Sequence, residues 1–522
     1  MDVSNALKTI EMKYAFKFKE KQMESIKYIM EGKDTFIVLP TGYGKSKIYT
    51  HLPEIHGLVR DTPGTVLVIS PLQSLMKDQV SKLNKMGILA TLVGECQSDK
   101  NIADLIREGQ YQLVFSSPEA ALTPGFWRRC FTTGVFHDNL LAVVVDEAHC
   151  IIEWGDDFRP EYGNLAHLRS IVPDKTVFIA MTATSTKEMK RRIIKHLDMC
   201  QSETQTVCML PERKNLTYVI KKSRKQTDEL HWILADLLEN KENAKKTIIY
   251  CRNIATCANL YEQFYINIDD AMNFDSRLIA MFHRSTTEEN KEQVLSEFPK
   301  QDSKLRLVFA TVAFGMGVDI PDVENIVHWG APRSLEQYSQ ESGRGGRDGR
   351  QCVCVLYFSG IDIAKDRSTD AMREFCRATG CIRKVLNDHF SLGTVREASN
   401  FEKDLCCCCS LCSEQCNCTN CFIPRCNADF VNVSEPVECD ELAVRYLTNK
   451  QMKLLKLNLQ DYQSVICEEN PSNIHDFDCQ LIEDIVSHSD TIMCIEDVIE
   501  LGLSKHDYAE DILLLIEEIE NL

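Results

Sequence analysis

Long apolar stretches are missing from this sequence, whose longest aliphatic run is LLAVVV at Leu140–Val145. A helix needs about 20 apolar residues to cross a bilayer, so the sequence predicts no membrane-spanning segment. The N-terminus, MDVSNALKTIEMKYAF, also lacks an apolar core of the secretory type. Both absences argue against membrane and secreted proteins, and we expect a soluble intracellular protein.

Sequence of low complexity is equally scarce, being confined to four consecutive cysteines at 406–409. With 44% hydrophobic and 26% charged residues, the composition is typical of a globular protein. A chain of 522 residues is too long for one compact core, and this length predicts three or four domains.

Negative charge is unevenly distributed along the chain. Of the 77 acidic and 59 basic residues, 22 and 5 lie in residues 427–522, which leaves 55 and 54 for the remainder. The net charge of −18 is therefore −17 in this tail and −1 elsewhere. The main body is compatible with a nucleic-acid partner, whereas the acidic tail is not expected to bind DNA directly.

Short apolar runs alternate with helical stretches through the first 360 residues. The runs that predict strands are DTFIVL, TVLVIS, QLVFSS, LLAVVVD and VFIAMTA, and then TIIYC, LIAMFH, RLVFAT, NIVHW and CVLYF. This alternation predicts an α/β fold with parallel, doubly wound sheets. We expect two such lobes at 1–205 and 206–360, a helical, cysteine-rich module at 361–426 and a mainly helical acidic tail at 427–522.

A Gly-rich turn, LPTGYGKS, follows the first predicted strand. Gly42 and Gly44 let the backbone wrap closely around phosphates. Lys45 can reach the β- and γ-phosphates, and Ser46 can hold Mg²⁺. A strict P-loop has glycine at its first position, where this chain has Leu39. An ordinary tight turn is the alternative interpretation of this motif alone.

Two carboxylates end the strand in VVVDEAHC. Asp146 suits Mg²⁺ binding, and Glu147 suits activation of the attacking water. An exposed acidic pair is the alternative, but the Gly-Lys-Ser turn upstream favours an ATPase. Arg344 and Arg347, in QESGRGGRDG, suit stabilisation of charge on a transferring phosphoryl group. Solvated charges or phosphate contacts to nucleic acid are the alternatives for these arginines.

As a set, these motifs resemble the RecQ branch of the superfamily 2 helicases. FKFKEKQ is similar to its adenine-recognition motif, with Lys19 where the family has arginine. SPLQSLMKDQV resembles the motif that contacts single-stranded DNA, and DEAHC continues into IIEWGDDFRPEY, which resembles an aromatic-rich loop. MTAT, IIYC and FATVAFGMGVDIPDV occupy the remaining motif positions in order, so that the resemblance covers about residues 10–425.

The resemblance implies a Mg²⁺- and ATP-dependent DNA helicase that moves 3′ to 5′ on single strands and junctions. It assigns nucleotide binding to Phe18, Gln22, Thr41, Gly42, Gly44, Lys45, Ser46, Asp146, Asp319 and Gln340. It assigns DNA contacts to Ser70, Gln79, Trp154, Phe158, Arg159 and Thr311. Bases stack on aromatic and arginine planes, which agrees with the residues of the aromatic-rich loop. Core positions are the alternative for its two aromatic residues, and helix caps or turns for Ser70, Gln79 and Thr311.

Nine of the 24 cysteines crowd into residues 406–426, which indicates a metal site in an intracellular chain. Cys406, Cys409 and Cys412 have the C-x₂-C-x₂-C spacing, and the family resemblance adds Cys381 as the first zinc ligand. Four thiolates form a closed tetrahedral Zn²⁺ site. A slip by one residue to Cys407 or Cys408 would change the ligands. A second metal or unbound thiols are equally compatible with the remaining four, Cys416, Cys418, Cys421 and Cys426.

The tail departs from the family, whose members commonly continue with a winged helix and a further small helical domain. We match the tail to neither. This leaves the expected ATPase activity untouched, but it leaves open whether the chain separates strands processively. In SKHDYAEDILLLIEEIENL, Ser504 and Asp507 predict a capping box. Ile512, Leu515, Ile516 and Ile519 form one apolar face. This face predicts packing within its own domain or, alternatively, binding of a protein partner.

Two functions compete at this stage. A DNA-stimulated ATPase would drive translocation and unwinding, whereas an ATP-gated DNA-binding or recruitment module would hydrolyse ATP without unwinding. RNA is a lesser alternative substrate, because phosphate and stacking contacts alone do not exclude it. We expect a nuclear protein, or one of the nucleoid or cytoplasm if the source is not eukaryotic. The chain has no clear basic import signal.

Overall fold

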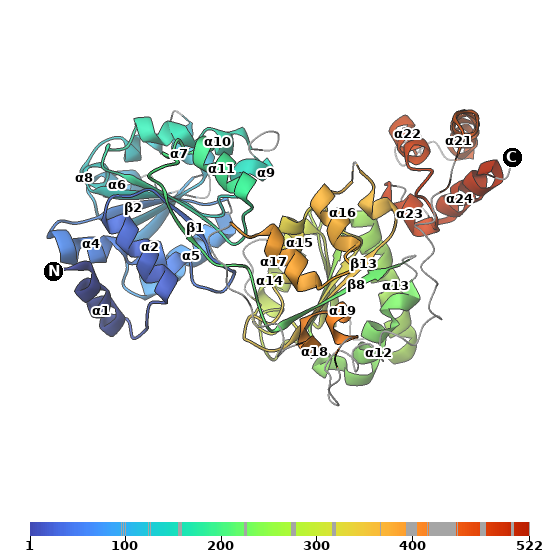
Figure 1. Ribbon diagram of the computed structural model, residues 1–522, viewed down its shortest axis with the longest axis horizontal. Coiled ribbons are helices and arrows are strands. Elements are labelled where there is room, and N and C mark those ends of the chain that lie inside the picture. Colours follow the sequence, from blue (N-terminus) through green and yellow to red (C-terminus); the bar gives the residue numbers. More distant parts are fainter. Residues whose placement is uncertain are drawn as a thin grey trace. The chain divides into compact units, whose positions relative to one another are not determined.

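The structure is a computed structural model. It describes residues 1–71, 73–94, 97, 99, 101–123, 125, 127–154, 159–223, 227–272, 278–315, 320–365, 367–392, 405–414, 416, 445, 447–469, 477–502 and 506–520. The chain divides into two compact units (Figure 1): the first contains residues 1–212 and a short segment that begins at residue 387, and the second contains residues 213–386 and the C-terminal segments from residue 399 on. Each unit is described separately.

The first unit is built on a parallel sheet with strand order β3-β4-β2-β5-β6-β1-β7. Its strands are β1 (Thr35–Val38), β2 (Thr65–Ile69), β3 (Ala90–Val93), β4 (Leu113–Ser116), β5 (Leu140–Val145), β6 (Val177–Thr182) and β7 (Gln205–Cys208). Each described pair of neighbouring strands is parallel. The central strands are continuously apolar and almost entirely buried, as expected when helices cover both faces of a parallel sheet.

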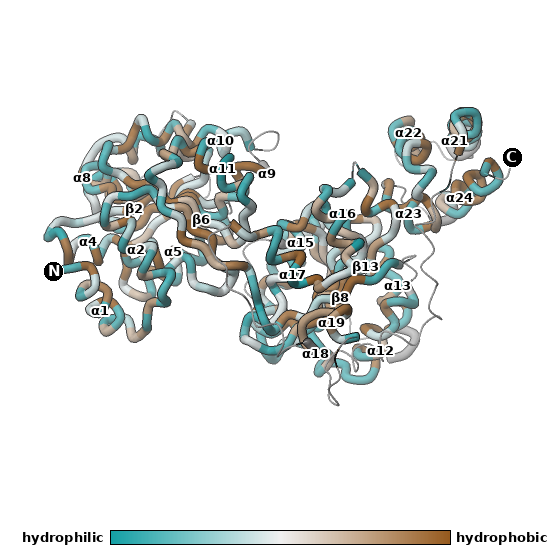
Figure 2. The backbone as a smooth tube through the Cα atoms, viewed as in Figure 1, coloured by the Kyte–Doolittle hydropathy of each residue, from teal (hydrophilic) through white to brown (hydrophobic). Residues whose placement is uncertain are grey.

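Helices surround this sheet, and in Figure 2 they alternate between hydrophilic and hydrophobic colours while the strands are mostly brown. The longer α-helices are α1 (Val3–Lys13), α2 (Glu20–Met30), α4 (Leu52–Arg60), α5 (Gln73–Lys85), α6 (Asn101–Arg107) and α11 (Lys187–His196). The short ones are α3 (Ser46–Thr50), α7 (Pro118–Leu122), α8 (Val135–Asp138), α9 (Cys150–Trp154) and α10 (Pro160–Gly163). Two 3₁₀ turns lie at Arg128–Phe131 and Leu165–Ser170.

The second unit contains another parallel sheet, with strand order β10-β11-β9-β12-β13-β8. Its strands are β8 (Leu216–Lys222), β9 (Thr247–Cys251), β10 (Ile279–Phe282), β11 (Leu307–Ala310), β12 (Asn325–Trp329) and β13 (Cys352–Phe358). Its helices are α12 (His231–Asn240), α13 (Ile254–Met272), α14 (Glu288–Glu297), α15 (Leu335–Ser342), α16 (Asp370–Cys376) and α17 (Ile382–His389). Its 3₁₀ turns are Thr227–Leu230, Lys241–Asn243, Val312–Gly315 and Ile361–Ile363.

A cysteine-bearing segment packs on the outer strand of this second sheet. It contains the short helices α18 (Leu405–Cys408) and α19 (Ser410–Ser413). Cys409 forms an isolated parallel bridge with Tyr218 on β8. The Thr217 hydroxyl donates to the carbonyl oxygen of Cys407 at 2.9 Å. The segment therefore extends the edge of the sheet, and its position depends on pairing with β8.

The described part of the acidic tail consists of α21 (Asn449–Glu469), α22 (Cys479–Ser487), α23 (Ile495–Glu500) and α24 (His506–Glu520). These helices share an apolar cluster in which Ile512, Ile516 and Ile519 are buried and Leu515 is partly buried. Ile361, which follows β13, belongs to the same cluster. The predicted apolar face therefore packs within its own domain, which was the first of the two predicted roles for it. The predicted capping residue Ser504 lies outside the described residues.

The tail also makes polar contacts with the second sheet's unit. The last carbonyl group of α23, at Glu500, accepts hydrogen bonds from Arg367 at 3.0 Å and from the Asn253 amide at 3.4 Å. Cationic and amide donors suit the negative end of a helix. Within the tail, buried Arg445 forms ion pairs with Glu517 and Glu520, which compensates part of the local acidity.

The predicted α/β class with parallel, doubly wound sheets is confirmed by both units. The predicted limit of the first lobe at residue 205 would divide β7, which pairs with β1 through Cys208. Strands β3, β7 and β8 had no counterpart among the predicted strands, because they are short or partly polar runs at or near sheet edges. In the described ranges, no helix is both long and apolar enough to cross a bilayer.

Candidate nucleotide, DNA and metal sites

The Gly-rich turn lies between β1 and α3, as its position after the first strand predicted. Gly42 and Gly44 have φ angles of 80° and 88°, which favour glycine. A Cβ on Gly44 would also lie 2.9 Å from Nε2 of Gln22. Lys45 turns its ammonium group back onto the carbonyl oxygen of Leu39, at 3.1 Å. The turn thus has the backbone freedom and the cation that phosphate binding requires.

Gln22, assigned to adenine recognition, is 1% exposed and is bonded at both ends of its amide. Its Nε2 donates to the carbonyl oxygens of Tyr43 and Gly44, at 3.0 and 2.9 Å. Its Oε1 accepts from the backbone N–H of Lys19 at 2.8 Å. Gln22 therefore ties α2 to the Gly-rich turn. Phe18 is 5% exposed and packs edge-on against Phe16.

Asp146 and Glu147 directly follow β5, and Asp146 is 8% exposed. Burial and the neighbouring charge of Glu147 raise the pKa of Asp146 to about 6, although the positive charge of Lys45 opposes this shift. A buried carboxylate of this kind is stabilised by a divalent cation. Glu147 has a left-handed backbone with a φ of 50°, and its Oε2 lies 3.4 Å from Nδ1 of His149.

His149 makes a connection that sequence reasoning did not anticipate. Its Nδ1 lies 3.2 Å from the hydroxyl oxygen of Thr182, which is at the end of β6. The Thr182 hydroxyl donates to the carbonyl oxygen of Thr184 at 2.9 Å. The two motifs DEAH and MTAT therefore meet where neighbouring parallel strands end. The strand assignments alone placed them at one sheet edge, but they did not specify this pair of atoms.

The residues assigned to DNA contact in the first unit have unequal environments. Ser70 is 1% exposed, and its hydroxyl has no hydrogen-bond partner in the described part of the chain. Gln79 is half-buried, and its Oε1 accepts from the Tyr49 hydroxyl at 2.6 Å. Trp154 ends α9, but its side chain and all of Phe158 lie outside what the structure describes.

Arg159, the third residue of the aromatic-rich loop, is engaged within the protein. Its guanidinium group binds both carboxylate oxygens of Glu119 at 2.7 Å and donates to the carbonyl oxygen of Pro71 at 2.7 Å. Burial opposes ionisation of Glu119, but hydrogen bonds from Arg159 and Ser117 outweigh it and lower the pKa of this carboxyl group. Arg159 thus connects the loop to the SPLQ segment. No local sequence pattern identifies Glu119 as its partner.

In the second unit, Gln340 lies on α15, and Arg344 and Arg347 lie in the turn that follows. Arg344 is 5% exposed, whereas Arg347 is half-buried. Nε2 of Gln340 is buried without a hydrogen-bond partner in the described ranges. Glu341 is the next residue after Gln340, and its Oε2 lies 3.0 Å from Nε2 of the buried His328 on β12.

Thr311 is 7% exposed and begins the turn after β11. Asp319 lies outside the described residues.

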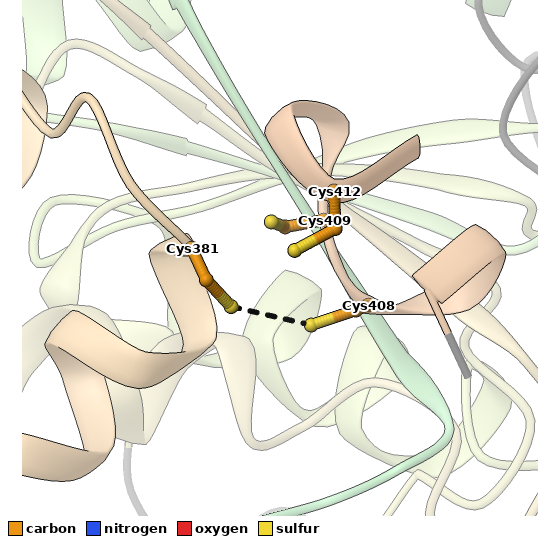
Figure 3. A group of neighbouring side chains, drawn as sticks. All are labelled: Cys381, Cys408, Cys409 and Cys412. Carbon is orange, nitrogen blue, oxygen red and sulfur yellow. Dashed lines mark hydrogen bonds between the residues drawn. The ribbon is translucent and has the colours of Figure 1, made fainter. Parts of the chain in front are cut away.

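Four thiols gather in the second unit (Figure 3). The sulfur atoms of Cys381, Cys408, Cys409 and Cys412 all lie within 4.8 Å of one another. Those of Cys381 and Cys408 are 3.5 Å apart. A tetrahedral site with Zn–S bonds of about 2.3 Å separates its sulfur atoms by roughly 3.8 Å, so the spacing fits zinc.

The fourth thiol of this cluster is Cys408, whereas sequence spacing favoured Cys406. Cys406 lies on α18, but its side chain is outside the described part. Cys408 joins Cys409 and Cys412 because α18 ends at Cys408 and the extended Cys409 that follows pairs with β8. Cys406 as a ligand stays a prediction. Of the second predicted group, Cys416 lies outside this cluster, and Cys418, Cys421 and Cys426 lie outside the described residues.

The neighbouring thiols shift one another's pKa values in opposite directions. Hydrogen bonds from Cys381 and Cys408 lower the pKa of Cys409 strongly, and burial raises the pKa of Cys412 to about 12. The thiolate form is thus favoured at Cys409, which accepts hydrogen bonds from the neighbouring thiols of Cys381 and Cys408. Arg383, on α17, donates to the carbonyl oxygens of Arg213 at 2.7 Å and Cys408 at 3.4 Å, and thereby holds the two cysteine segments together.

Comparison with known proteins first defines the class. A DEAD/DEAH box helicase model matches residues 19–192, and a helicase conserved C-terminal domain model matches residues 229–349. Among solved structures, the helicase MrfA bound to DNA has a TM-score of 0.54 at 19% identity, covering 69% of this chain and 51% of MrfA. Dbp5 of S. cerevisiae bound to RNA has a TM-score of 0.51 at 15% identity, covering 74% and 91%. These structures share the helicase fold.

Curated relatives then define the family. ATP-dependent helicase SGS1 of Saccharomyces cerevisiae is 31% identical over 84% of this chain and 30% of its own length. ATP-dependent DNA helicase RecQ of Bacillus subtilis is 35% identical over 67% of this chain and 55% of its own. The chain belongs to the RecQ family of superfamily 2 helicases. It spans less than two thirds of the length of these relatives.

Proposed function

We propose that this protein is a DNA-dependent ATPase that translocates 3′ to 5′ on single-stranded DNA and separates strands. The observation that carries the proposal is the arrangement of Lys45 and the buried Asp146–Glu147 pair at the end of parallel strands in the first unit. Its RecQ relatives are named as ATP-dependent DNA helicases, and one structural neighbour is bound to DNA.

The first unit would bind the phosphates of ATP through the Gly-rich turn and Lys45. Ser46 and Asp146 would hold Mg²⁺, which supplies charge neutralisation on the phosphate oxygens. Ionised Asp146 suits this role, because the pKa of about 6 leaves it largely charged at neutral pH. Glu147 would accept the proton of the attacking water.

Arg347 of the second unit would stabilise negative charge on the transferring phosphoryl group, with Arg344 in a supporting role. Gln340 and Asp319 would complete the nucleotide contacts of this unit. Its Thr311 would bind single-stranded DNA, as would Ser70, Gln79 and the aromatic-rich loop of the first unit. Strand separation would follow from cycles of ATP binding and hydrolysis that alter these DNA contacts.

The cysteine cluster would hold one structural Zn²⁺ through Cys381, Cys408, Cys409 and Cys412. Support comes from the mutual distances of the thiols. A closed four-thiolate site has no open position for substrate, so its contribution would be to folding. It would join α17 to the segment paired with β8.

An ATP-gated DNA-binding module remains the second candidate, but the RecQ relatives are named as helicases and do not favour it. The acidic tail would supply a protein-binding surface or would occlude the DNA site by mimicry. Deletion of residues 427–522 without a change in DNA affinity would argue against occlusion. We also propose a nuclear location for the protein, which microscopy of the tagged chain would test.

The central experiment is the ATPase rate against increasing single-stranded DNA, with Lys45→Ala and Trp154→Ala in parallel. We expect strong stimulation that is abolished by the first substitution and uncoupled from DNA by the second. A strand-displacement assay on the same preparations separates a helicase from an ATP-gated module. Equal ATPase rates with and without DNA in the wild-type protein would contradict the proposal.

A further inference from the structure

A single hydroxyl group joins two functionally distinct helices of the first unit. Helix α3 begins at Ser46, directly after Lys45, and carries the fully buried Tyr49. The Tyr49 hydroxyl donates to Oε1 of Gln79 on α5 at 2.6 Å. Helix α5 belongs to the SPLQSLMKDQV segment, which was assigned to single-stranded DNA. One short hydrogen bond therefore links the helix of the phosphate-binding turn to the helix of the DNA motif.

The surroundings of Tyr49 keep this bond in place. Its ring packs edge-on against Phe115 of β4, with centroids 6.3 Å apart and an interplanar angle of 70°. Burial, and then the charge of Asp146, raises the pKa of Tyr49 well above the ordinary value, so that the hydroxyl remains a proton donor. A buried hydroxyl that loses its acceptor is costly. A displacement of α3 would therefore draw Gln79 with it.

The same bond determines how Gln79 presents its amide. Because Oε1 accepts the buried Tyr49 proton, the NH₂ group must point in another direction from the same planar amide. The side chain is half-buried, and no described residue forms a hydrogen bond with its Nε2. Two N–H donors are consequently available, and amide donors of this kind commonly bind phosphate oxygens of nucleic acids.

We infer that Tyr49 is a positioning residue that couples the nucleotide site to the single-stranded DNA site, an inference that rests on the DNA-dependent ATPase proposed above. Tyr49 orients the amide of Gln79 toward DNA and transmits movement of α3 to α5 when the nucleotide binds beside Lys45. Coupling of binding is reciprocal, so that DNA held by Gln79 increases nucleotide affinity through the same bond. Tyr49 itself touches neither ligand.

The full chain with Tyr49→Phe tests this inference, because the ring is retained and only the hydroxyl is lost. We expect the ratio of DNA-stimulated to DNA-free ATPase rates to fall roughly 3- to 10-fold, the range for loss of one coupled hydrogen bond. The change in single-stranded DNA Kd on adding a non-hydrolysable ATP analogue should shrink by a similar factor.

Tyr14→Phe is the matched control. Its hydroxyl donates to Glu54 on α4 at 2.9 Å. The variant therefore loses one tyrosine hydrogen bond but retains the bond between Tyr49 and Gln79. A purely structural role for Tyr49 would lower the melting temperature and leave the stimulation ratio of both variants at the wild-type value. That result would overturn the inference.

Gln79→Ala and the double variant with Tyr49→Phe complete the cycle. We expect Gln79→Ala to lower the stimulation ratio and the double variant to be no worse than Gln79→Ala alone. Additive losses in the double variant would overturn the inference. An unchanged ratio in Gln79→Ala would overturn it as well, and this result does not depend on the folding of Tyr49→Phe. Absence of DNA stimulation in the wild-type protein would instead defeat the helicase proposal, and the inference with it.

Discussion

The Gly-rich turn of the first unit and the thiol cluster of the second differ in how far the local sequence determines which residues come together. Lys45 and Ser46 are neighbours in sequence, and the strand–turn–helix around them directs both to one end of the sheet. The thiol cluster combines Cys381 with residues from 408 onward, and pairing with β8 selects which consecutive cysteine turns inward. Contiguous motifs are thus specified locally, whereas clusters of repeated residues depend on tertiary contacts.

The largest expected effect is on the locally specified site. Lys45→Ala should lower the ATPase rate at least roughly 100-fold, because it removes the cation that we propose to contact the phosphates of ATP. In the part of the chain that the structure describes, the Lys45 ammonium group donates to the carbonyl oxygen of Leu39 alone, so the fold should be retained. Steady-state ATPase assays with circular dichroism as the folding control measure both. Loss of the helical signal would show that the fold depends on Lys45, so that the Gly-rich turn would not be specified by local sequence alone.

Cysteine substitutions test the thiol cluster, which depends on contacts between distant segments. Cys408→Ser should reduce bound zinc from roughly one equivalent to nearly none, because a structural site needs four ligands. Nucleotide binding by the first unit should persist. Cys406→Ser is the matched control and should retain the metal. Elemental analysis of both purified variants gives the result, and the opposite pattern would restore the register predicted from sequence spacing.

Arg159 lies between these extremes, because its motif is local but its partner Glu119 is not. Arg159→Lys retains the charge but loses the two-pronged ion pair. If Arg159 positions the loop, this variant and Glu119→Gln should each lower DNA stimulation of the ATPase, roughly 3- to 10-fold. DNA affinity assays provide the contrast: rescue by lysine with no effect of Glu119→Gln would indicate a direct phosphate contact.

The smallest effect concerns stability of the first unit toward acid. His51 packs against Phe16 and Phe18, and burial lowers its pKa from 6.5 to about 4, with Glu54 opposing and Lys47 reinforcing the shift. The unfolded chain therefore binds the proton first, and stability decreases as pH falls from about 6.5 towards 4.

Between pH 7.5 and 5.5 this linkage amounts to about 1.4 kcal/mol. His51→Phe retains an aromatic ring without a titrating group, and should reduce the pH dependence of the urea midpoint. Equal slopes for the variant and the wild-type protein would exclude His51 as the source.

Much of the fold followed from patterns that the chain carries locally. Runs such as LLAVVV are buried on both faces and so require a parallel sheet covered by helices. The edge strands β3 and β7 are shorter and less apolar, and they were missed because pairing with β4 and β1 supplies what their own sequences do not.

The sequence by itself determined the class of protein, the order of its motifs and the residues of the Gly-rich turn. Each of these depends on contacts between residues close in the chain or on strand ends that must meet. Only the tertiary structure decided that Arg159 pairs with Glu119, that Tyr49 binds Gln79 and that Cys408 joins the thiol cluster. These choices depend on packing between distant segments, where a shift of one residue exchanges one buried side chain for another.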